Sequence, residues 1–155
     1  IGFQTFAGGL LFGLGTMFFL LFNGLHIGAI AGHLTASGFG EPFWSFVSGH
    51  SAFELTAIVL SGAAGLELGW ALVSPGQKTR ARALIEAARR VIGLVYGAAL
   101  LFFLAAFVEA FWSSMTYIPP MLKYGVGVAL WVVLLAYFAV MGRDVKASRG
   151  ERLGA

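Results

Sequence analysis

Three ionisable side chains lie within apolar stretches of this sequence, and these are the residues most able to do chemistry. His50 and Glu54 are four residues apart, and Glu109 lies in a separate apolar stretch. An ionised side chain costs about 2.5–3.5 kcal/mol at the centre of a membrane helix on insertion scales, so it is expected to face a partner or a polar cavity. Residues four apart share one face of a helix. The sequence therefore predicts a polar site that contains these three residues.

The composition is that of an integral membrane protein. Of 155 residues, 59% are hydrophobic and only 11% are charged, whereas soluble domains carry about 25% charged residues. The chain has no cysteine, which excludes disulfides, thiolate metal ligands and cysteine nucleophiles. A phosphate-binding loop and a basic, aromatic surface for nucleic acid are also missing from the sequence, so we expect no nucleic-acid partner.

The apolar segments predict an all-α membrane protein, a bundle of about four transmembrane helices. A crossing needs about 20 apolar residues, and the expected spans are residues 3–33, 49–73, 91–112 and 121–141. They form a membrane domain of residues 1–142, followed by a basic tail of residues 143–155. Pro42 is expected to begin a short interfacial or re-entrant helix before the second span. The first span is longer than a crossing requires, so it must tilt, project beyond the bilayer or bend near Asn23 and Gly24.

Basic residues predict the orientation of the bundle. Five lie between the second and third spans and four follow the fourth, so nine of the ten lysines and arginines are on one side, and Lys123 is the exception. By the positive-inside rule that side is cytoplasmic. We therefore expect a multi-pass protein of the cell membrane with both ends of this chain inside. Residues 80–90 have helical propensity and are expected to lie along the inner leaflet.

Small residues recur every four positions, which lets the backbones of membrane helices approach closely. One set lies in the first span and another in the second; the predicted packing positions are Gly24, Gly28, Gly32, Gly65 and Gly69. Two uses are open, namely packing within a compact bundle and formation of a homodimer.

With this topology, the polar residues of different spans fall at similar depths, in the outer half of the membrane. The expected cluster contains Asn23, His26, His50, Glu54 and Glu109. It has three interpretations. It could be a hydrogen-bonded core that fixes helix register, or a proton or ion relay in which histidine titrates near neutrality. It could also bind a divalent metal such as zinc through His50, Glu54, Glu109 and His26, which are ligand types that zinc accepts.

The order of these motifs resembles the stage II sporulation protein M family. The resemblance extends from about Leu10 to Pro120 and rests on Phe22-Asn23-Gly24-Leu25, Gly49-His50-Ser51-Ala52-Phe53-Glu54-Leu55, Gly65-Leu66-Glu67-Leu68-Gly69 and Phe107-Val108-Glu109-Ala110-Phe111. Two positions depart from the family pattern: Ser51 stands where glycine usually follows the histidine, and Gly49 stands where proline often precedes it. Residue by residue, the resemblance implies that the positions matching the family's motifs are Asn23, Gly24, His50, Glu54 and Glu109.

The resemblance also implies a function. The family's namesake is similar to a membrane anchor and scaffold of a peptidoglycan-degrading complex that acts during engulfment. We therefore expect a noncatalytic assembly component in cell-envelope remodelling, in contact with membrane lipid and with a second copy or other envelope proteins. Two alternatives use the same cluster. One is an intramembrane metal-dependent hydrolase with Glu54 or Glu109 as general base, and the other is a small ion or solute transporter.

The orientation can be tested by chemical labelling. Because the chain has no native cysteine, a label placed at Gly38, in the loop before Pro42, is expected to react with a membrane-impermeant maleimide added to intact cells. Labelling that occurs only after permeabilisation would show the opposite orientation.

Overall fold

A computed structural model describes the backbone of residues 1–153 and the side chains of residues 1–141. Within these residues the chain forms helices and no strand. The α-helices are α1 (Gly2–Ala7), α2 (Leu14–Leu34), α3 (Gly40–Ser48), α4 (Ser51–Val73), α5 (Arg80–Val108) and α6 (Pro120–Leu153). Three short turns join them: the 3-10 turn η1 (Gly8–Leu10) and the π turns η2 (Thr35–Phe39) and η3 (Glu109–Ser113).

The predicted fold class is confirmed. Four helical stretches are long and apolar enough to cross a membrane, namely Leu14–Ser48, Ser51–Val73, Arg80–Ser113 and Pro120–Met141. The short helix expected before the second span is α3, which continues from α2 across a kink at Gly38. Gly38 has φ 86°, a backbone conformation that favours glycine, so the neighbouring exposed Ser37 is the less strained position for a cysteine label.

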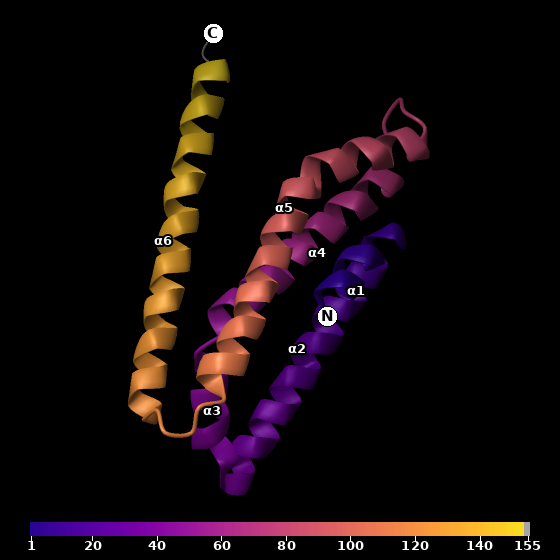
Figure 1. Cartoon of the computed structure of the whole chain (residues 1–155). Helices are drawn as coiled ribbons and strands as arrows, with labels where there is room; N and C mark the ends of the chain where they lie inside the picture. The colour runs from indigo at the N-terminus through magenta and orange to yellow at the C-terminus, as the bar shows by residue number, and fades with distance from the viewer. Residues whose placement is uncertain (154–155) are drawn as a thin grey trace.

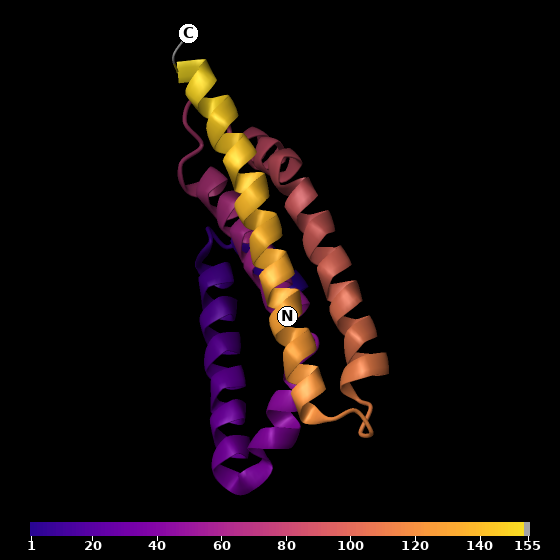
Figure 2. The same ribbon diagram turned by 90° about the vertical axis from the view of Figure 1, so that its left-hand side faces the viewer.

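The helices are arranged around α4. Helices α4 and α5 pack side by side, α1 and α2 lie against α4, and α6 meets the bundle chiefly at α3. Figure 1 shows α6 diverging from the α4–α5 pair toward its C-terminal end. In Figure 2, turned by 90°, the α2–α3 kink and the α5–α6 connection lie at one end of the molecule and the α4–α5 connection at the other. The basic α4–α5 connection is thus at the same end as the C-terminal part of α6.

The first predicted span, residues 3–33, is divided into two helices. The break lies at Leu11–Gly13, where Phe12 has φ 55° and Gly13 has φ 83°, and α2 runs without a bend through Asn23 and Gly24. Left-handed backbone conformations interrupt a right-handed helix. The segment before the break therefore folds back on α2 as α1, in place of extending the first span.

Small residues let α1 and α2 approach α4 closely. Thr16 Oγ1 donates to the carbonyl of Thr5 at 2.7 Å, and both threonine side chains are fully buried. A Cβ atom on Gly65 would lie 2.8 Å from that same carbonyl oxygen, and one on Gly69 would meet the backbone of Gly13. In contrast, Cβ atoms on Gly24, Gly28 and Gly32 would meet nothing within 4 Å. Of the predicted packing positions, close packing within this chain thus uses Gly65 and Gly69 of α4 and leaves Gly24, Gly28 and Gly32 of α2 open.

Residues 80–90 are not a separate surface helix. They form the first turns of α5, whose N-cap Thr79 accepts a hydrogen bond from the backbone N–H of Arg82. No proline or glycine interrupts the chain between Arg80 and Arg90, so the helix continues directly into the apolar third span. Arg90 Nη2 lies 2.6 Å from Glu67 Oε1 on α4 and links the two helices at the basic end.

Addition of a methyl group at the α1–α4 contact is expected to destabilise the fold. We predict that Gly65→Ala lowers the free energy of unfolding by about 1–3 kcal/mol, the usual cost of overpacking a filled site. The matched control is Gly93→Ala on α5, where a Cβ atom would meet nothing within 4 Å. Unfolding midpoints of the two variants in the same detergent give the comparison, and equal midpoints would contradict the packing described here.

Candidate functional site

A cluster of polar side chains lies where α3, α4, η3 and the start of α6 meet. We call it the His50 junction and define it as Gly49, His50, Glu54, Ser113 and Lys123. His50 is the N-cap residue of α4 and the second residue of the two-residue turn that separates α4 from α3. Glu54 lies in the first turn of α4, where the helix dipole favours negative charge.

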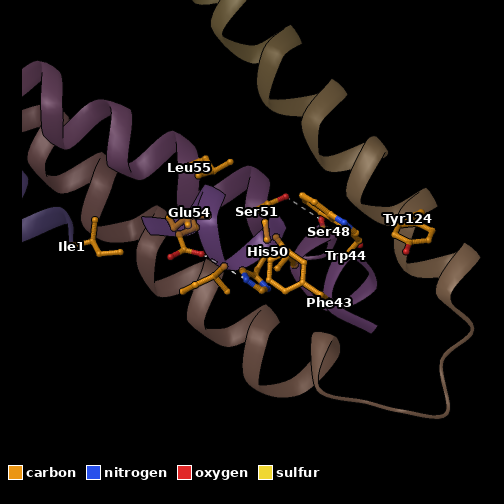
Figure 3. Close-up of a pocket in the computed structure, with 13 residues that line it drawn as sticks. Ile1, Phe43, Trp44, Ser48, His50, Ser51, Glu54, Leu55 and Tyr124 are labelled. Atoms are coloured by element: carbon orange, nitrogen blue, oxygen red, sulfur yellow. Dashed lines mark hydrogen bonds and ion pairs between the residues drawn. The ribbon is translucent and has the colours of Figure 1, made fainter. Parts of the chain in front are cut away.

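His50 is buried and contacts other residues on several sides. Its side chain is 5% exposed, and Nδ1 lies 3.1 Å from Ser113 Oγ. Nε2 lies 3.7 Å from Glu54 Oε2, and the ring packs edge-on against Phe46 with centroids 5.3 Å apart. Figure 3 shows the imidazole and the carboxylate facing each other. The hydrogen bond to Ser113 joins α4 to η3, two segments far apart in the sequence.

Lys123 completes the junction from α6. Only 6% of this lysine is exposed, and Nζ donates to the backbone carbonyl of Ser113 at 2.8 Å. Ser113 therefore contacts α4 through its hydroxyl and α6 through its carbonyl. A buried ammonium group is costly without such a partner, so this contact fixes the start of α6 beside η3.

Two glycines allow these elements to approach one another. A Cβ atom on Gly49 would lie 2.8 Å from Ser113 Oγ and 3.0 Å from Trp112 Cδ1. A Cβ atom on Gly127 would lie 2.5 Å from the carbonyl oxygen of Ser48, so α6 passes directly against the end of α3. Any side chain at either position would displace η3 or α6 from the junction.

A cavity of about 550 Å³ lies beside the junction, between α2, α3, α4 and the start of α6. Its lining is mainly apolar, and it includes His50, Glu54 and the Tyr124 hydroxyl. Figure 3 shows these residues together with the cavity's aromatic side chains, Phe43, Trp44 and Tyr124. The Glu54 side chain is 36% exposed, and its carboxylate makes no hydrogen bond with the residues whose side chains are described.

The other predicted cluster residues lie apart from this pair. Asn23 donates its amide to the carbonyl of Phe19, one turn back on α2, at 2.7 Å. His26 is exposed and stacks on Phe22 with ring centroids 5.9 Å apart. Glu109 is exposed, and among residues 1–141 no hydrogen bond or ion pair joins its carboxylate to His50 or Glu54.

The donor set for a metal is therefore incomplete in the described part of the chain. No group of three or more histidine, aspartate or glutamate side chains there could hold a metal ion. Of the predicted ligands, the structure brings together only His50 and Glu54, whereas zinc sites in proteins use three or four protein ligands.

Ser113, His50 and Glu54 form a row that has the same residue types as a serine hydrolase triad. A nucleophile must reach its substrate, yet Ser113 is 2% exposed and does not line the cavity. Its hydroxyl lies behind the imidazole, on the side away from Glu54. The hydrogen bond between His50 and Ser113 is therefore a contact between helices rather than part of a catalytic triad.

Two of these contacts were missed in the sequence analysis. Ser113 follows the predicted third span, residues 91–112, and it lies 63 positions from His50. Lys123 carried a signal, since it was the one basic residue outside the two basic segments. A lysine at the start of an apolar span, away from the other cations, indicates a specific partner.

Comparison with known proteins adds a family match. The family model described as Stage II sporulation protein M matches residues 1–114. The matched range contains α1 to α5 and η3, hence every residue of the His50 junction except Lys123. No curated protein and no solved structure matches the chain.

Loss of the Ser113 hydroxyl is expected to weaken the junction. We predict that Ser113→Ala lowers the free energy of unfolding by about 1–3 kcal/mol, because His50 Nδ1 is left buried without its partner. The neighbouring Ser114→Ala is the matched control, since that hydroxyl is exposed and bonds only to the carbonyl of Ala110. If both variants unfold at the same temperature in detergent, the His50–Ser113 bond contributes nothing to stability.

Proposed function

Since a family model covers residues 1–114, the chain belongs to the stage II sporulation protein M family, and we propose that it is a noncatalytic scaffold of cell-envelope remodelling. In this proposal the protein assembles in the cell membrane with a second copy or with other envelope proteins. Both ends of this chain are cytoplasmic, as the distribution of basic residues predicts.

One observation carries the proposal: the polar side chains of the junction are used in contacts between helices. His50 bonds to Ser113, and Lys123 bonds to the carbonyl of Ser113. These two contacts link α4, η3 and α6 at one end of the molecule, and the hydroxyl that resembles a nucleophile is buried. Such a junction supports a rigid helical frame better than it supports turnover of a substrate.

The open face of α2 supports assembly with another membrane helix. Gly24, Gly28 and Gly32 lie on one side of α2, and Cβ atoms there would meet nothing within 4 Å. Small residues in this spacing let a second helix approach closely, with packing and weak hydrogen bonds as the attractive force. We propose this face as the contact with a partner helix, and a homodimer through α2 is the simplest form.

Transport of an ion or solute is the second candidate. Ser113, His50 and Glu54 form a continuous row from the protein interior to the cavity, and a histidine in such a row can pass a proton. Proton flux in proteoliposomes that is lost in Glu54→Gln would favour this candidate over the scaffold.

Cysteine cross-linking tests the scaffold. In this cysteine-free chain, Gly28→Cys is expected to form disulfide-linked or maleimide-bridged complexes in native membranes, and Gly93→Cys, an equally open glycine of α5, is the control. The bulky variant Gly28→Leu should lower partner recovery about tenfold, which corresponds to roughly 1.4 kcal/mol, with Gly93→Leu unchanged.

Two results would contradict the proposal. One is equal cross-linking at residues 28 and 93, which would mean random collision in the membrane. The other is a stoichiometric metal in the purified protein that is lost in both His50→Ala and Glu54→Ala, since a metal at that pair would favour the hydrolase.

A further inference from the structure

The cavity beside the His50 junction has the features of a ligand site. Its volume of about 550 Å³ lies within the range of about 300–1,000 Å³ that is typical of small-molecule pockets. Its walls come from Ile1, α2, α3, α4 and the start of α6, and they are mainly apolar. Apolar walls with one charged group suit a molecule that has an alkyl chain and a polar head.

Glu54 determines which polar head group the cavity would accept. The carboxylate faces the cavity, makes no hydrogen bond within the described residues, and is 3.7 Å from the nearest cationic candidate, His50 Nε2. A carboxylate in apolar surroundings requires donors. The Glu54 side chain is 36% exposed, so a ligand from outside the protein can reach it. A ligand that supplies N–H or O–H donors would satisfy the carboxylate, and a cation does so best.

Aromatic side chains add to the preference for a cation. Phe43, Trp44 and Tyr124 line the same cavity. Two of them are held through their polar atoms, since Trp44 Nε1 donates to Thr35 Oγ1 at 3.0 Å and the Tyr124 hydroxyl donates to the carbonyl of Glu41 at 3.4 Å. These hydrogen bonds use the polar atoms and leave the ring faces available to contact an ammonium group through cation–π interactions.

We propose that this cavity binds one phosphatidylethanolamine molecule of the surrounding bilayer, with its ammonium at Glu54 and an acyl chain along the apolar wall from α2. A primary ammonium has three N–H donors for the carboxylate, whereas the quaternary ammonium of phosphatidylcholine has none. Phosphatidylglycerol is anionic and is repelled by the same group. This site is independent of the scaffold role, because it does not involve the glycine face of α2.

Native mass spectrometry of the full chain tests the proposal. The purified protein is incubated with equimolar phosphatidylethanolamine, phosphatidylcholine and phosphatidylglycerol that carry identical acyl chains. Wild-type protein is expected to retain the ethanolamine lipid about tenfold over the other two, which corresponds to roughly 1.4 kcal/mol, because its primary ammonium can form a charge-assisted hydrogen bond with the Glu54 carboxylate. Glu54→Gln should abolish that preference, so that the three lipids are retained about equally. Glu109→Gln, which removes an exposed carboxylate outside the cavity lining, should leave it unchanged.

A second pair of variants tests whether the apolar cavity itself, apart from the head-group contact, is needed for lipid retention. Ile30 lines the cavity, so Ile30→Trp should lower retention of all three lipids by filling the space. Leu25 lies on the same helix, is 75% exposed and is absent from the lining, so Leu25→Trp should have no effect. Circular dichroism checks that each variant is folded.

Three outcomes would overturn the proposal: retention without head-group preference, a preference that survives in Glu54→Gln, or equal retention of phosphatidylcholine. A cross-link from Ile30→Cys to a protein partner that excludes lipid would also overturn it, because the cavity would then belong to an interface. The glycine-face cross-linking is scored separately, so failure of either proposal leaves the other standing.

Discussion

A buried imidazole that must find its hydrogen-bond partners inside the protein is the constraint on which this structure depends. The His50 side chain is 5% exposed, so solvent cannot supply its partners and His50 fixes where the residues around it can lie. Its bond to Ser113 brings η3 to the start of α4, and the carbonyl of the same serine receives Lys123 from α6. Glycine at positions 49 and 127 is a consequence, since a Cβ atom would meet the side chains of Ser113 and Trp112 at Gly49 and the backbone of Ser48 at Gly127.

The sequence was sufficient to predict the class of fold, because length and apolarity decide whether a segment can cross a membrane. Four long apolar helices and the short helix before the second span are present. The break at Phe12 and Gly13 was missed because that segment is as apolar as its neighbours. Glycines at positions 8, 9, 13 and 15 are the sequence signal in this segment, because glycine pairs mark turns, and the left-handed conformation of Phe12 and Gly13 makes the break.

The candidate site could be predicted in part. Spacing placed His50 and Glu54 on one helical face, and the structure pairs them. Depth in the membrane also grouped Asn23 and Glu109 with that pair, but depth does not fix the rotation of a helix about its axis. Asn23 satisfies its amide within its own helix, and Glu109 lies on an exposed face. Ser113 could not be selected from sequence alone, because serine is common in loops and its role comes from one contact across the fold.

The attachment of α6 has a mechanical consequence. This helix contacts the bundle chiefly near α3, through Lys123 and through Gly127 against Ser48, and diverges from α4 and α5 beyond that point. From Pro120 to Met141 it has 22 residues, a length of about 33 Å at 1.5 Å per residue. A rotation of roughly 10° about the attached end would displace the far end by about 6 Å. The helix can therefore act as a lever, in which a small rearrangement at one membrane surface becomes a large movement at the other.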